Sequence, residues 1–474
     1  MLFRSHLPKT TLASALLVGA TSGLFAAPAS FSALPAPPPQ GDIVAVRAHK
    51  LYVRPGTVLD DATVLIRDGV IVKVGSDLKL PEGVLLIEGD VVCAGFMDPW
   101  GSLGMNAAAT VDTKTNAATR AIDAVDPYLH PWYRNRALAA GVTAVRVQAE
   151  MFTPRGGVGA VLSTAPAADR KSMVLLEDSN AAASLGLSTG GRVQDVFARI
   201  GAVDKLVKEI RSGRDYAIAW TKYGHEMDAW REAIAEKEQK LEKDFKKAKK
   251  SREKEIAEAK EKDKEFKEEK YKEDKQPKKP KLDAEDAVMA RVASGELPFV
   301  VTIHRAAELR ALLEGTAQFK RLRLVIAGGT EAEAVADQLA ARGIPVIVRP
   351  APLGASRPDE YSGHDLALAG RLADAGVRVL LGSSGGRSED LPLLASLAIG
   401  HGLDRDKALA ALTTEVARTF DLSGELGSLR PGRRADLLVL DGEPLLPTTS
   451  VRYVLSAGRV LISPDSSSST DTED

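Results

Sequence analysis

The strongest constraint on the fold is a short apolar segment, residues 91–102, that stops abruptly at glycine, aspartate and proline. It reads Val-Val-Cys-Ala-Gly-Phe-Met-Asp-Pro-Trp-Gly-Ser. An apolar run of this length, bounded by turn-forming residues, is typical of a buried strand. We therefore predict a core strand over residues 91–96 whose C-terminal end opens into a loop.

Six further apolar runs alternate with amphipathic helical stretches along the middle of the chain. They cover residues 143–147, 173–176, 299–303, 322–326, 345–348 and 377–381. Helices are expected after most of them, for example over 305–314 and 331–342. This alternation favours βα units and a mainly parallel sheet. With residues 91–96 it gives seven strands. An eight-stranded barrel is the economical closure, with the missing strand sought between residues 181 and 220.

Short β segments also occur at both ends of the chain. Near the start they cover residues 43–48, 62–67, 70–74 and 84–88, and near the end residues 435–442 and 451–460. Arg67-Asp68-Gly69 has the composition of a hairpin turn between alternating apolar positions. Because such short strands are not stable alone, we expect the two chain ends to pair with each other.

Three motifs in these segments resemble the amidohydrolase superfamily, and most closely its imidazolonepropionase-like branch. They are Gly95-Phe96-Met97-Asp98, the run Ile-Arg-Asp-Gly-Val-Ile-Val-Lys-Val-Gly at 66–75, and Gly-Ser-Leu-Arg-Pro-Gly-Arg-Arg-Ala-Asp-Leu at 427–437. The resemblance implies an α/β fold with a (β/α)8 TIM-like barrel over residues 94–426. It also implies a small β-sandwich formed by both chain ends, residues 42–93 and 427–463.

The resemblance further implies a divalent metal, usually zinc, at the C-terminal ends of the barrel strands, where it lowers the pKa of a bound water. The family uses two histidines after the first strand, one after the fifth, one after the sixth, and an aspartate after the eighth that takes the proton. In this chain His304 stands at the fifth-strand position. The other four family positions are vacated and hold Trp100, Ser102, Gly328 and Ser384.

One imidazole cannot hold a catalytic zinc, because zinc hydrolases normally use about three protein ligands. We therefore expect no metal and no other cofactor, and His304 is the best candidate for a catalytic residue. Glu389 and Asp390, shortly after Ser384, are the nearby carboxylates that could replace the lost base. An indole at position 100 would fill part of the metal cavity with apolar volume.

Other residues near these motifs have structural interpretations. Asp98 is expected to accept backbone hydrogen bonds at a strand end. The glycine-rich stretch 154–160 lacks the Lys-Ser/Thr ending of a phosphate-binding loop and is interpreted as a long loop over the barrel mouth. The remaining histidines of the barrel region are expected to be surface or packing residues: His130, His225, His364 and His401.

The residues leave two functional hypotheses open. The first is an exported amidohydrolase-superfamily pseudoenzyme, catalytically impaired, that serves as a binding or scaffold subunit for a small-molecule ligand. The second is an active hydrolase of carbon-nitrogen bonds other than peptide bonds, with an altered site that uses His304. Metal content separates them most directly.

A segment from about residue 231 to 281 is foreign in composition, being mostly Lys and Glu. It is too polar to join a core, and its Glu/Lys pairs at helical spacing favour one or two long exposed helices. It ends at a Gln-Pro-Lys-Lys-Pro breaker at 276–280. The segment is interpreted either as a solvated excursion or as a docking arm for a protein partner. Balanced charges and few aromatic residues argue against nucleic acid.

The N-terminal residues 1–29 have the layout of a cleavable secretory signal. Arg4 and Lys9 precede the apolar stretch 10–25, and small residues follow. The apolar stretch is interrupted by glycines and falls short of the ~20 residues that a membrane span needs. We therefore expect a periplasmic or secreted protein with no membrane span after signal cleavage.

Composition sets the remaining limits. Of 474 residues 44% are hydrophobic, and the formal net charge of -1 gives no chain-wide bias toward nucleic acid or membrane. Residues 30–41 are rich in Pro and Ala and read as an extended tether, and residues 464–474 as a disordered tail. Cys93 is the only cysteine, so an intrachain disulfide is impossible.

Overall fold

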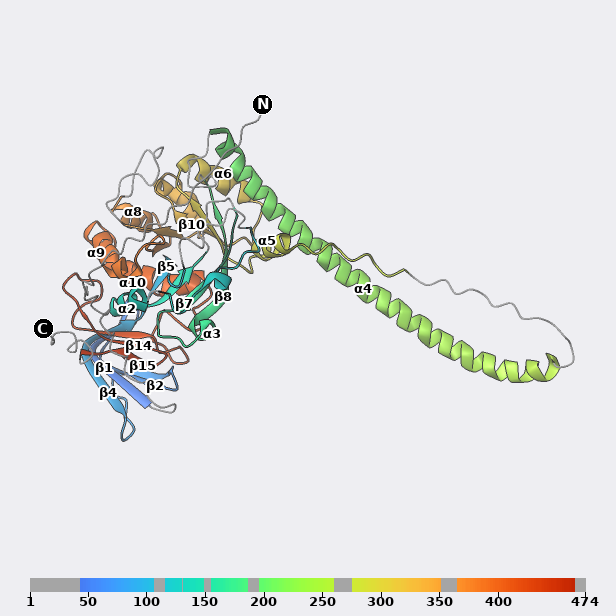
Figure 1. Ribbon diagram of the computed structural model, residues 1–474, viewed down its shortest axis with the longest axis horizontal. Helices are drawn as coiled ribbons and strands as arrows, with labels where there is room; N and C mark the ends of the chain where they lie inside the picture. Colours follow the sequence, from blue (N-terminus) through green and yellow to red (C-terminus); the bar gives the residue numbers. More distant parts are fainter. Residues whose placement is uncertain are drawn as a thin grey trace, which may run out of the picture.

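The computed structural model describes residues 43–105, 116–129, 131–148, 155–185, 196–259, 275–350 and 365–464. Figure 1 shows a β domain at one side, a barrel beside it, and a long helical arm that leaves the barrel. The expected signal segment, the tether, and all but the first residue of the tail lie outside the described residues.

Both chain ends build one seven-stranded sheet, as predicted. Its order is β15-β14-β13-β4-β1-β2-β3. Strand β4 pairs antiparallel with β13, from Ala94 opposite Leu437 to Val91 opposite Leu440. The strands are β1 (Ile43–Arg54), β2 (Thr57–Arg67), β3 (Val70–Gly75), β4 (Leu85–Ala94), β13 (Leu437–Leu440), β14 (Val451–Ser456) and β15 (Arg459–Ile462).

The two faces of this sheet serve different cores because side chains alternate along a strand. Val92 and Val439 belong to the sheet's own apolar cluster. Cys93, Leu438 and Leu440 point the other way and join the large core around the barrel. The β domain is therefore attached to the barrel by buried apolar contacts.

An eight-stranded sheet forms the nearly closed barrel. Its order is β12-β11-β10-β9-β8-β7-β6-β5. Strands β5 and β12 meet where Gly385 N donates to Trp100 O at 2.8 Å. The strands are β5 (Phe96–Gly101), β6 (Val142–Val147), β7 (Arg155–Ser163), β8 (Val174–Ser184), β9 (Phe299–Ile303), β10 (Leu324–Gly328), β11 (Val346–Val348) and β12 (Val379–Leu381).

The apolar run at 91–96 was predicted to be a single barrel strand. In the structure it contributes to two strands of different sheets. Strand β4 ends at Ala94 and β5 begins at Phe96. Gly95 is the crossing point, and its N–H donates to Asp436 O of the β domain at 3.0 Å. A Cβ on Gly95 would stand 2.2 Å from Oγ1 of Thr143, so only glycine fits there.

The eighth strand is β7, whereas the sequence analysis sought it within residues 181–220. The glycine-rich stretch 154–160, which was expected to form a loop over the barrel mouth, is part of this strand, so that prediction was wrong. Strand β7 runs antiparallel to both β6 and β8. Its glycines allow close packing: a Cβ on Gly157 would stand 2.2 Å from Thr119 O, and one on Gly159 would stand 2.4 Å from Asn180 Oδ1. Glycine weakens the usual strand pattern, which is why the sequence favoured a loop.

Helices cover the outside of the barrel. The predicted helices over 305–314 and 331–342 are both present, the second as a 3-10 turn followed by a short α-helix. A buried Phe420 and residues around it contribute to the barrel's interior cluster. The elements are η1 (Ala121–Ala124), α2 (Pro131–Ala139), α3 (Arg170–Met173), α6 (Ala306–Thr316), η2 (Ala332–Val335), α7 (Ala336–Ala341), α8 (Leu368–Asp374), η3 (Ser388–Asp390), α9 (Leu391–Gly400), α10 (Arg405–Leu412) and α11 (Thr414–Thr419).

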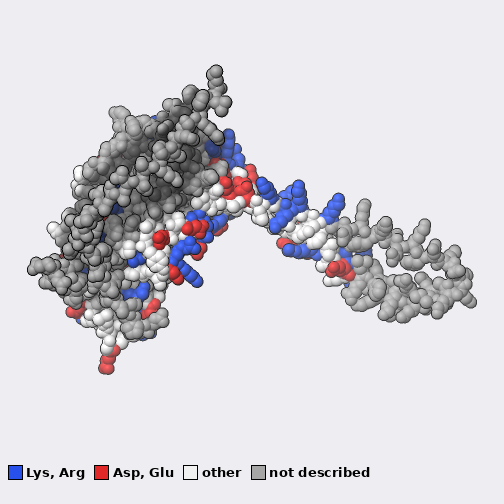
Figure 2. Space-filling view, in the orientation of Figure 1, with Lys and Arg blue, Asp and Glu red and all other residues white. Residues whose placement is uncertain are grey.

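The arm is built on one helix, α4 (Val196–Ala259), which begins well before the predicted insertion. It crosses α5 (Ala284–Ser294) so closely that a Cβ on Gly213 would stand 2.3 Å from the backbone of Met289. Lysines, arginines and acids are interspersed along the part of the arm nearest the barrel (Figure 2). No described helix is long and apolar enough to cross a bilayer.

The end of the predicted insertion packs against α4, so the insertion is not wholly solvated. Gln276 Nε2 lies 3.6 Å from the sulfur of Met227. The ammonium of Lys279 lies 5.8 Å from the ring centroid of Trp220, within range of a cation–π contact. Residues 260–274 lie outside the described part of the chain.

Candidate ligand site at the barrel mouth

All five positions singled out from the sequence lie at or just after the C-terminal ends of barrel strands. Trp100 is in β5 and Ser102 follows it. His304 follows β9, Gly328 ends β10, and Ser384 follows β12. In barrel enzymes this end carries the reactive groups. The structure brings His304 against Gly328, and it places Trp100 beside the loop after β12 through hydrogen bonds.

Asp98 joins the first and last strands of the barrel. The side chain is fully buried. Oδ1 accepts hydrogen bonds from the N–H of Trp100 at 2.9 Å and the N–H of Ser383 at 3.1 Å, and Oδ2 accepts from Ser388 Oγ at 2.7 Å. The carboxylate therefore closes the sheet and has the structural role expected from the sequence.

Trp100 is partly buried, and its side chain packs against the apolar cluster inside the barrel. Its carbonyl accepts from Ser383 Oγ at 3.0 Å as well as from Gly385 N. The indole thus adds apolar volume beside the barrel core at a position where the family places a metal-binding imidazole.

The imidazole of His304 occupies the space beside Gly328. Gly328 has φ +87°, and a Cβ there would stand 2.5 Å from Cε1 and 2.7 Å from Nε2 of His304. On the other side of the ring, Nδ1 lies 3.4 Å from Thr330 Oγ1. The residue is buried, with 6% of its surface exposed. Residue 328 could carry a side chain only if His304 moved.

The carboxylates proposed as substitutes for the lost base do not have the geometry of a base. Glu389 Oε1 lies 3.0 Å from Arg136 Nε and 2.7 Å from Arg387 Nη2. One carboxylate oxygen of Glu389 is thus held by two guanidinium groups. Asp390 stands before α9 without a side-chain capping bond.

Of the four other histidines of the barrel region, the structure describes two, and both are exposed. His225 is exposed on α4, and His401 is exposed at the end of α9. His130 and His364 lie outside the described residues. These placements agree with surface positions for the two histidines that the structure describes.

Sequence reasoning missed one residue of the barrel interior, Arg146 on β6. Its neighbour Ala144 belongs to the interior cluster, whereas Val145 and Val147 face the outer core, so Arg146 points inward. It is 1% exposed. The signal was present, because a lone arginine interrupts the apolar run Val-Thr-Ala-Val-Arg-Val at 142–147.

The Arg146 guanidinium is held by neutral groups. Nε donates to Pro99 O at 2.5 Å, and Nη1 donates to Gln148 Oε1 at 2.7 Å and Asn180 Oδ1 at 2.8 Å. Its Cζ lies 5.1 Å from the ring centroid of Phe420. Burial lowers the pKa of Arg146 to about 9, against a partly opposing attraction from Asp98.

These residues do not fit the family's divalent metal. Among the residues that the structure describes, no three His, Cys, Asp or Glu side chains come together as a metal-binding group. At the family positions stand an indole, two hydroxyls and a glycine whose side-chain space is filled. The interior positive charge is instead a guanidinium, which repels a cation.

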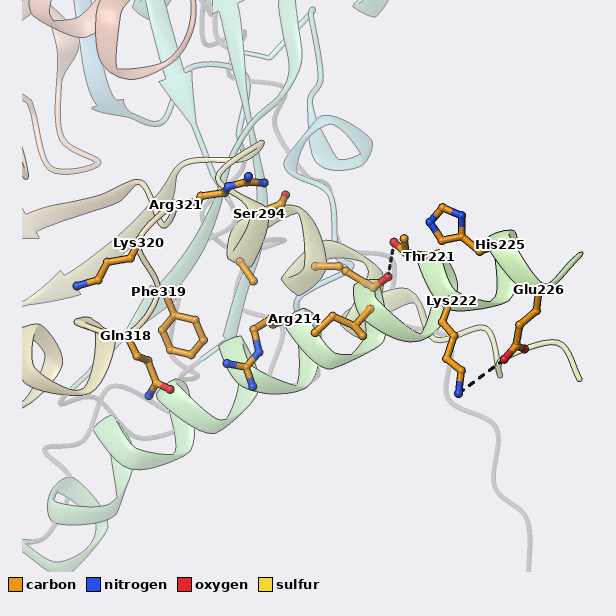
Figure 3. Close-up of a pocket in the computed structure, with 14 residues that line it drawn as sticks. Arg214, Thr221, Lys222, His225, Glu226, Ser294, Gln318, Phe319, Lys320 and Arg321 are labelled. Atoms are coloured by element: carbon orange, nitrogen blue, oxygen red, sulfur yellow. Dashed lines mark hydrogen bonds and ion pairs between the residues drawn. The ribbon is translucent and has the colours of Figure 1, made fainter. Parts of the chain in front are cut away.

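A second concave feature lies at the root of the arm, about 690 Å³ in volume (Figure 3). Its floor is apolar and includes Ile218, which is 58% exposed, and Phe319. Four cations stand around it, with Glu226 as the one lining carboxylate: Arg214, Lys222, Lys320 and Arg321.

The barrel and the composite β domain agree with the architecture that the amidohydrolase resemblance implied, and comparisons with known proteins find that resemblance over part of the chain. Residues 298–462 match the amidohydrolase family. Over 82 residues the chain is 42% identical to the imidazolonepropionase of Geobacillus kaustophilus (strain HTA426). That match covers 16% of this chain and 19% of the enzyme, so the chain matches about a fifth of the length of this curated relative.

Solved structures show the same fold at low identity. An amidohydrolase from Thermotoga maritima MSB8 superposes with a TM-score of 0.66 at 21% identity, over 89% of this chain and 100% of that one. A prolidase complexed with N-methylphosphonate-L-proline gives a TM-score of 0.51 at 16% identity, over 89% of this chain and 100% of that one. At such identities the likeness concerns the fold alone.

Proposed function

We propose that this protein is an exported, catalytically impaired member of the superfamily that binds a small molecule in its barrel without the family's metal. The observation that carries the proposal is the contact between His304 and Gly328. The retained imidazole fills the space that a ligand side chain at position 328 would need. One ligand position is thus closed sterically as well as chemically, and the remaining imidazole cannot hold a zinc alone.

Metal analysis tests this proposal. Elemental analysis of protein purified without chelator is expected to show far less than one zinc, iron or manganese per chain. Titration with zinc against a competing chelator is expected to show no tight binding. Near-stoichiometric metal, or zinc binding as tight as in an intact family member, would overturn the proposal.

The alternative is a hydrolase of carbon-nitrogen bonds other than peptide bonds that works through His304. It predicts a hydrolase activity that survives treatment with a chelator. His304→Gln should abolish this activity, and Thr330→Ala, which removes the neighbouring hydroxyl, should leave part of it. An amide or lactam panel assayed with wild type and these two variants separates the two functions.

Export is part of the proposal and rests on residues 1–29 alone. Expressed from its full sequence in a bacterium, the protein should appear in the periplasm or medium. N-terminal sequencing of the purified protein should begin near residue 30. A cytoplasmic protein that retains Met1 would contradict this part.

We also propose that the groove at the arm root receives a protein partner in the form of an acidic amphipathic helix. The groove follows α4 from Arg214 to Glu226, about 18 Å at 1.5 Å per residue, or roughly three helical turns. Its apolar floor suits the apolar stripe of a helix, and its cationic rim suits acidic flanks. Figure 3 shows Arg214 and Phe319 on this groove, with Lys222 paired to Glu226 at its outer end.

A synthetic helical peptide of Leu and Glu, with Leu at helical spacing on one face, tests the groove by fluorescence anisotropy. Saturable binding is expected, at least tenfold weaker for the matched peptide with Lys in place of Glu. Ile218→Asp should abolish binding. Leu393→Asp should not, because Leu393 is a similarly exposed aliphatic residue on α9, outside the groove. Equal binding of both peptides, or no effect of Ile218→Asp, would overturn the proposal.

A further inference from the structure

Arg146 brings a guanidinium into the barrel, and no carboxylate among the described residues forms an ion pair with it. All its hydrogen-bond acceptors are neutral: a backbone carbonyl and the amides of Gln148 and Asn180. Its third nitrogen, Nη2, is buried and has no hydrogen-bond partner among the described residues. A buried guanidinium with a free N–H pair is costly unless something satisfies it.

Asp98 does not fill that role. Both its oxygens are engaged by Trp100, Ser383 and Ser388, and it acts on Arg146 only through space. Asn180 Oδ1, which accepts from Nη1, is shared with Ser179 Oγ at 2.8 Å. The polar groups around Arg146 therefore position its guanidinium but do not neutralise it.

A second guanidinium faces the same end of the barrel. Arg349 follows β11, two positions after the interior residue Ile347, and its Nε is also buried without a partner among the described residues. Its Nη2 would stand 3.7 Å from a Cβ on Gly386, beside the loop that follows β12. Arg146 and Arg349 thus both leave donors unused on the inner side of the barrel's C-terminal half.

Partly exposed residues lie next to Arg146 and at the barrel mouth. Gln148, which touches Arg146 Nη1, is partly exposed, as are Trp100 and Ser384 at the mouth. The link through Gln148 connects the buried guanidinium to a residue that solvent reaches.

We propose that Arg146 is the anion-binding residue of the barrel, and that the ligand is a small carboxylate or the carboxylate end of a larger molecule. This inference rests on the proposed metal-free binding function and names the ligand class of that site. A carboxylate accepts two hydrogen bonds from guanidinium groups in a charge-assisted geometry, and it would supply the missing counter-charge. The positive charge that a metal provides in the family is provided here by arginine.

The experiment compares propionate with propionamide, which has the same shape and no charge, at constant ionic strength. Thermal unfolding of the full chain should shift to higher temperature with the logarithm of propionate concentration, as expected for a ligand that binds only the folded state. Propionamide should give no shift. Equal shifts with both compounds, or none with either up to the solubility limit, would overturn the inference.

Two variants at Gln148 provide the matched control. Gln148→Glu places a carboxylate on Arg146 Nη1, so it should raise the melting temperature without ligand and remove the propionate shift. Gln148→Met removes the same hydrogen bond without adding charge and should keep the shift. A propionate shift that survives in Gln148→Glu would place the anion elsewhere and overturn the inference.

Arg146→Lys should weaken propionate binding at least tenfold while keeping the charge, because an ammonium has three N–H donors and cannot keep the bonds to Pro99, Gln148 and Asn180 and also donate to an anion. The test of the anion site and the test of the metal-free function can fail independently of each other. Bound metal together with a Gln148-dependent propionate shift would overturn the metal-free function and leave the anion site standing. Absence of both metal and shift would do the reverse.

Discussion

The imidazole of His304 lies where the side chain of residue 328 would begin, with Cε1 2.5 Å from the position of a Cβ on Gly328. The two residues end adjacent parallel strands, β9 and β10, whose register pairs Ile303 with Gly328. Each residue therefore fixes what the other can be. As long as the ring of His304 stays in this place, position 328 excludes a side chain.

This relationship predicts a non-additive pair of substitutions. Gly328→Ala should destabilise the protein by roughly 2–4 kcal/mol, because it adds a close contact with the ring to the strain of a side chain at positive φ. In a His304→Ala background the same change should cost only about 1–2 kcal/mol. Urea unfolding of the four proteins in a double-mutant cycle measures the difference. Additive effects would show that the ring does not fill this space.

Ser384 is a second strained position at the mouth. Its φ is +57°, in the left-handed region that disfavours side chains. Ser384→Gly should therefore stabilise the protein by about 0.5–1 kcal/mol, whereas the β-branched Ser384→Val should destabilise it by more than 1 kcal/mol. Chemical denaturation at neutral pH measures both. A loss of stability in Ser384→Gly would mean that the hydroxyl makes a contact worth more than the strain.

Asp98 should be essential for closing the barrel. Asp98→Asn keeps the size of the side chain but turns one acceptor oxygen into a donor that faces N–H or O–H groups. A loss of about 2–4 kcal/mol is expected, since a buried charge-assisted network is broken. Ser388→Ala, which removes one of the three bonds, should cost only about 1 kcal/mol. Equal losses in the two variants, read from urea midpoints, would contradict this ranking.

The arm should tolerate a deletion only if the returning segment, residues 275–281, is kept. Replacing residues 232–274 with a short Gly/Ser linker should leave the melting temperature almost unchanged. Removing residues 231–281 should lower it, because Lys279 and Gln276 then no longer cover Trp220 and Met227. Scanning calorimetry of the two deletions decides the point. Equal melting temperatures would show that the returning segment adds nothing to stability.

The buried thiol of Cys93 predicts a loss of stability at high pH. Burial raises the pKa of Cys93 to about 12, so the folded thiol stays protonated where the unfolded one ionises. Between pH 9 and 12 the folded state binds more protons, and stability falls as pH rises, by roughly 1.4 kcal/mol per pH unit. Cys93→Ala should lack this component when urea midpoints at pH 8 and 10 are compared. An identical pH dependence in both proteins would contradict it.

The fold was largely predictable because it depends on local patterns. Apolar runs of strand length, turn residues such as Arg67-Asp68-Gly69 and the Gly95-x-x-Asp98 motif each constrain their own segment. They gave the barrel, and they gave the pairing of the chain ends that β4 and β13 confirm. Two predictions failed where glycine serves close packing instead of a turn, at Gly95 and in β7.

The candidate site was only partly predictable. Motif alignment located Trp100, Gly328 and Ser384 at strand ends, yet it gave no sign that His304 fills the space over Gly328, since that depends on the ring's rotamer and on the register of two strands. Arg146 was overlooked because its role depends on the face of β6 that it occupies, and only barrel closure assigns that face to the interior.

The sequence by itself determined most of the strands and helices, that both chain ends belong together, and which residue types stand at the barrel strand ends. These properties follow from the order of apolar, turn-forming and chemically competent residues along the chain. Only the tertiary structure decided that β7 completes the barrel, that Lys279 returns to Trp220, and that a buried guanidinium faces into the barrel. Each of these depends on contacts between segments that are distant in the sequence. For Arg146, closure of the barrel fixes the inward direction of the side chain and brings neutral acceptors to its charge.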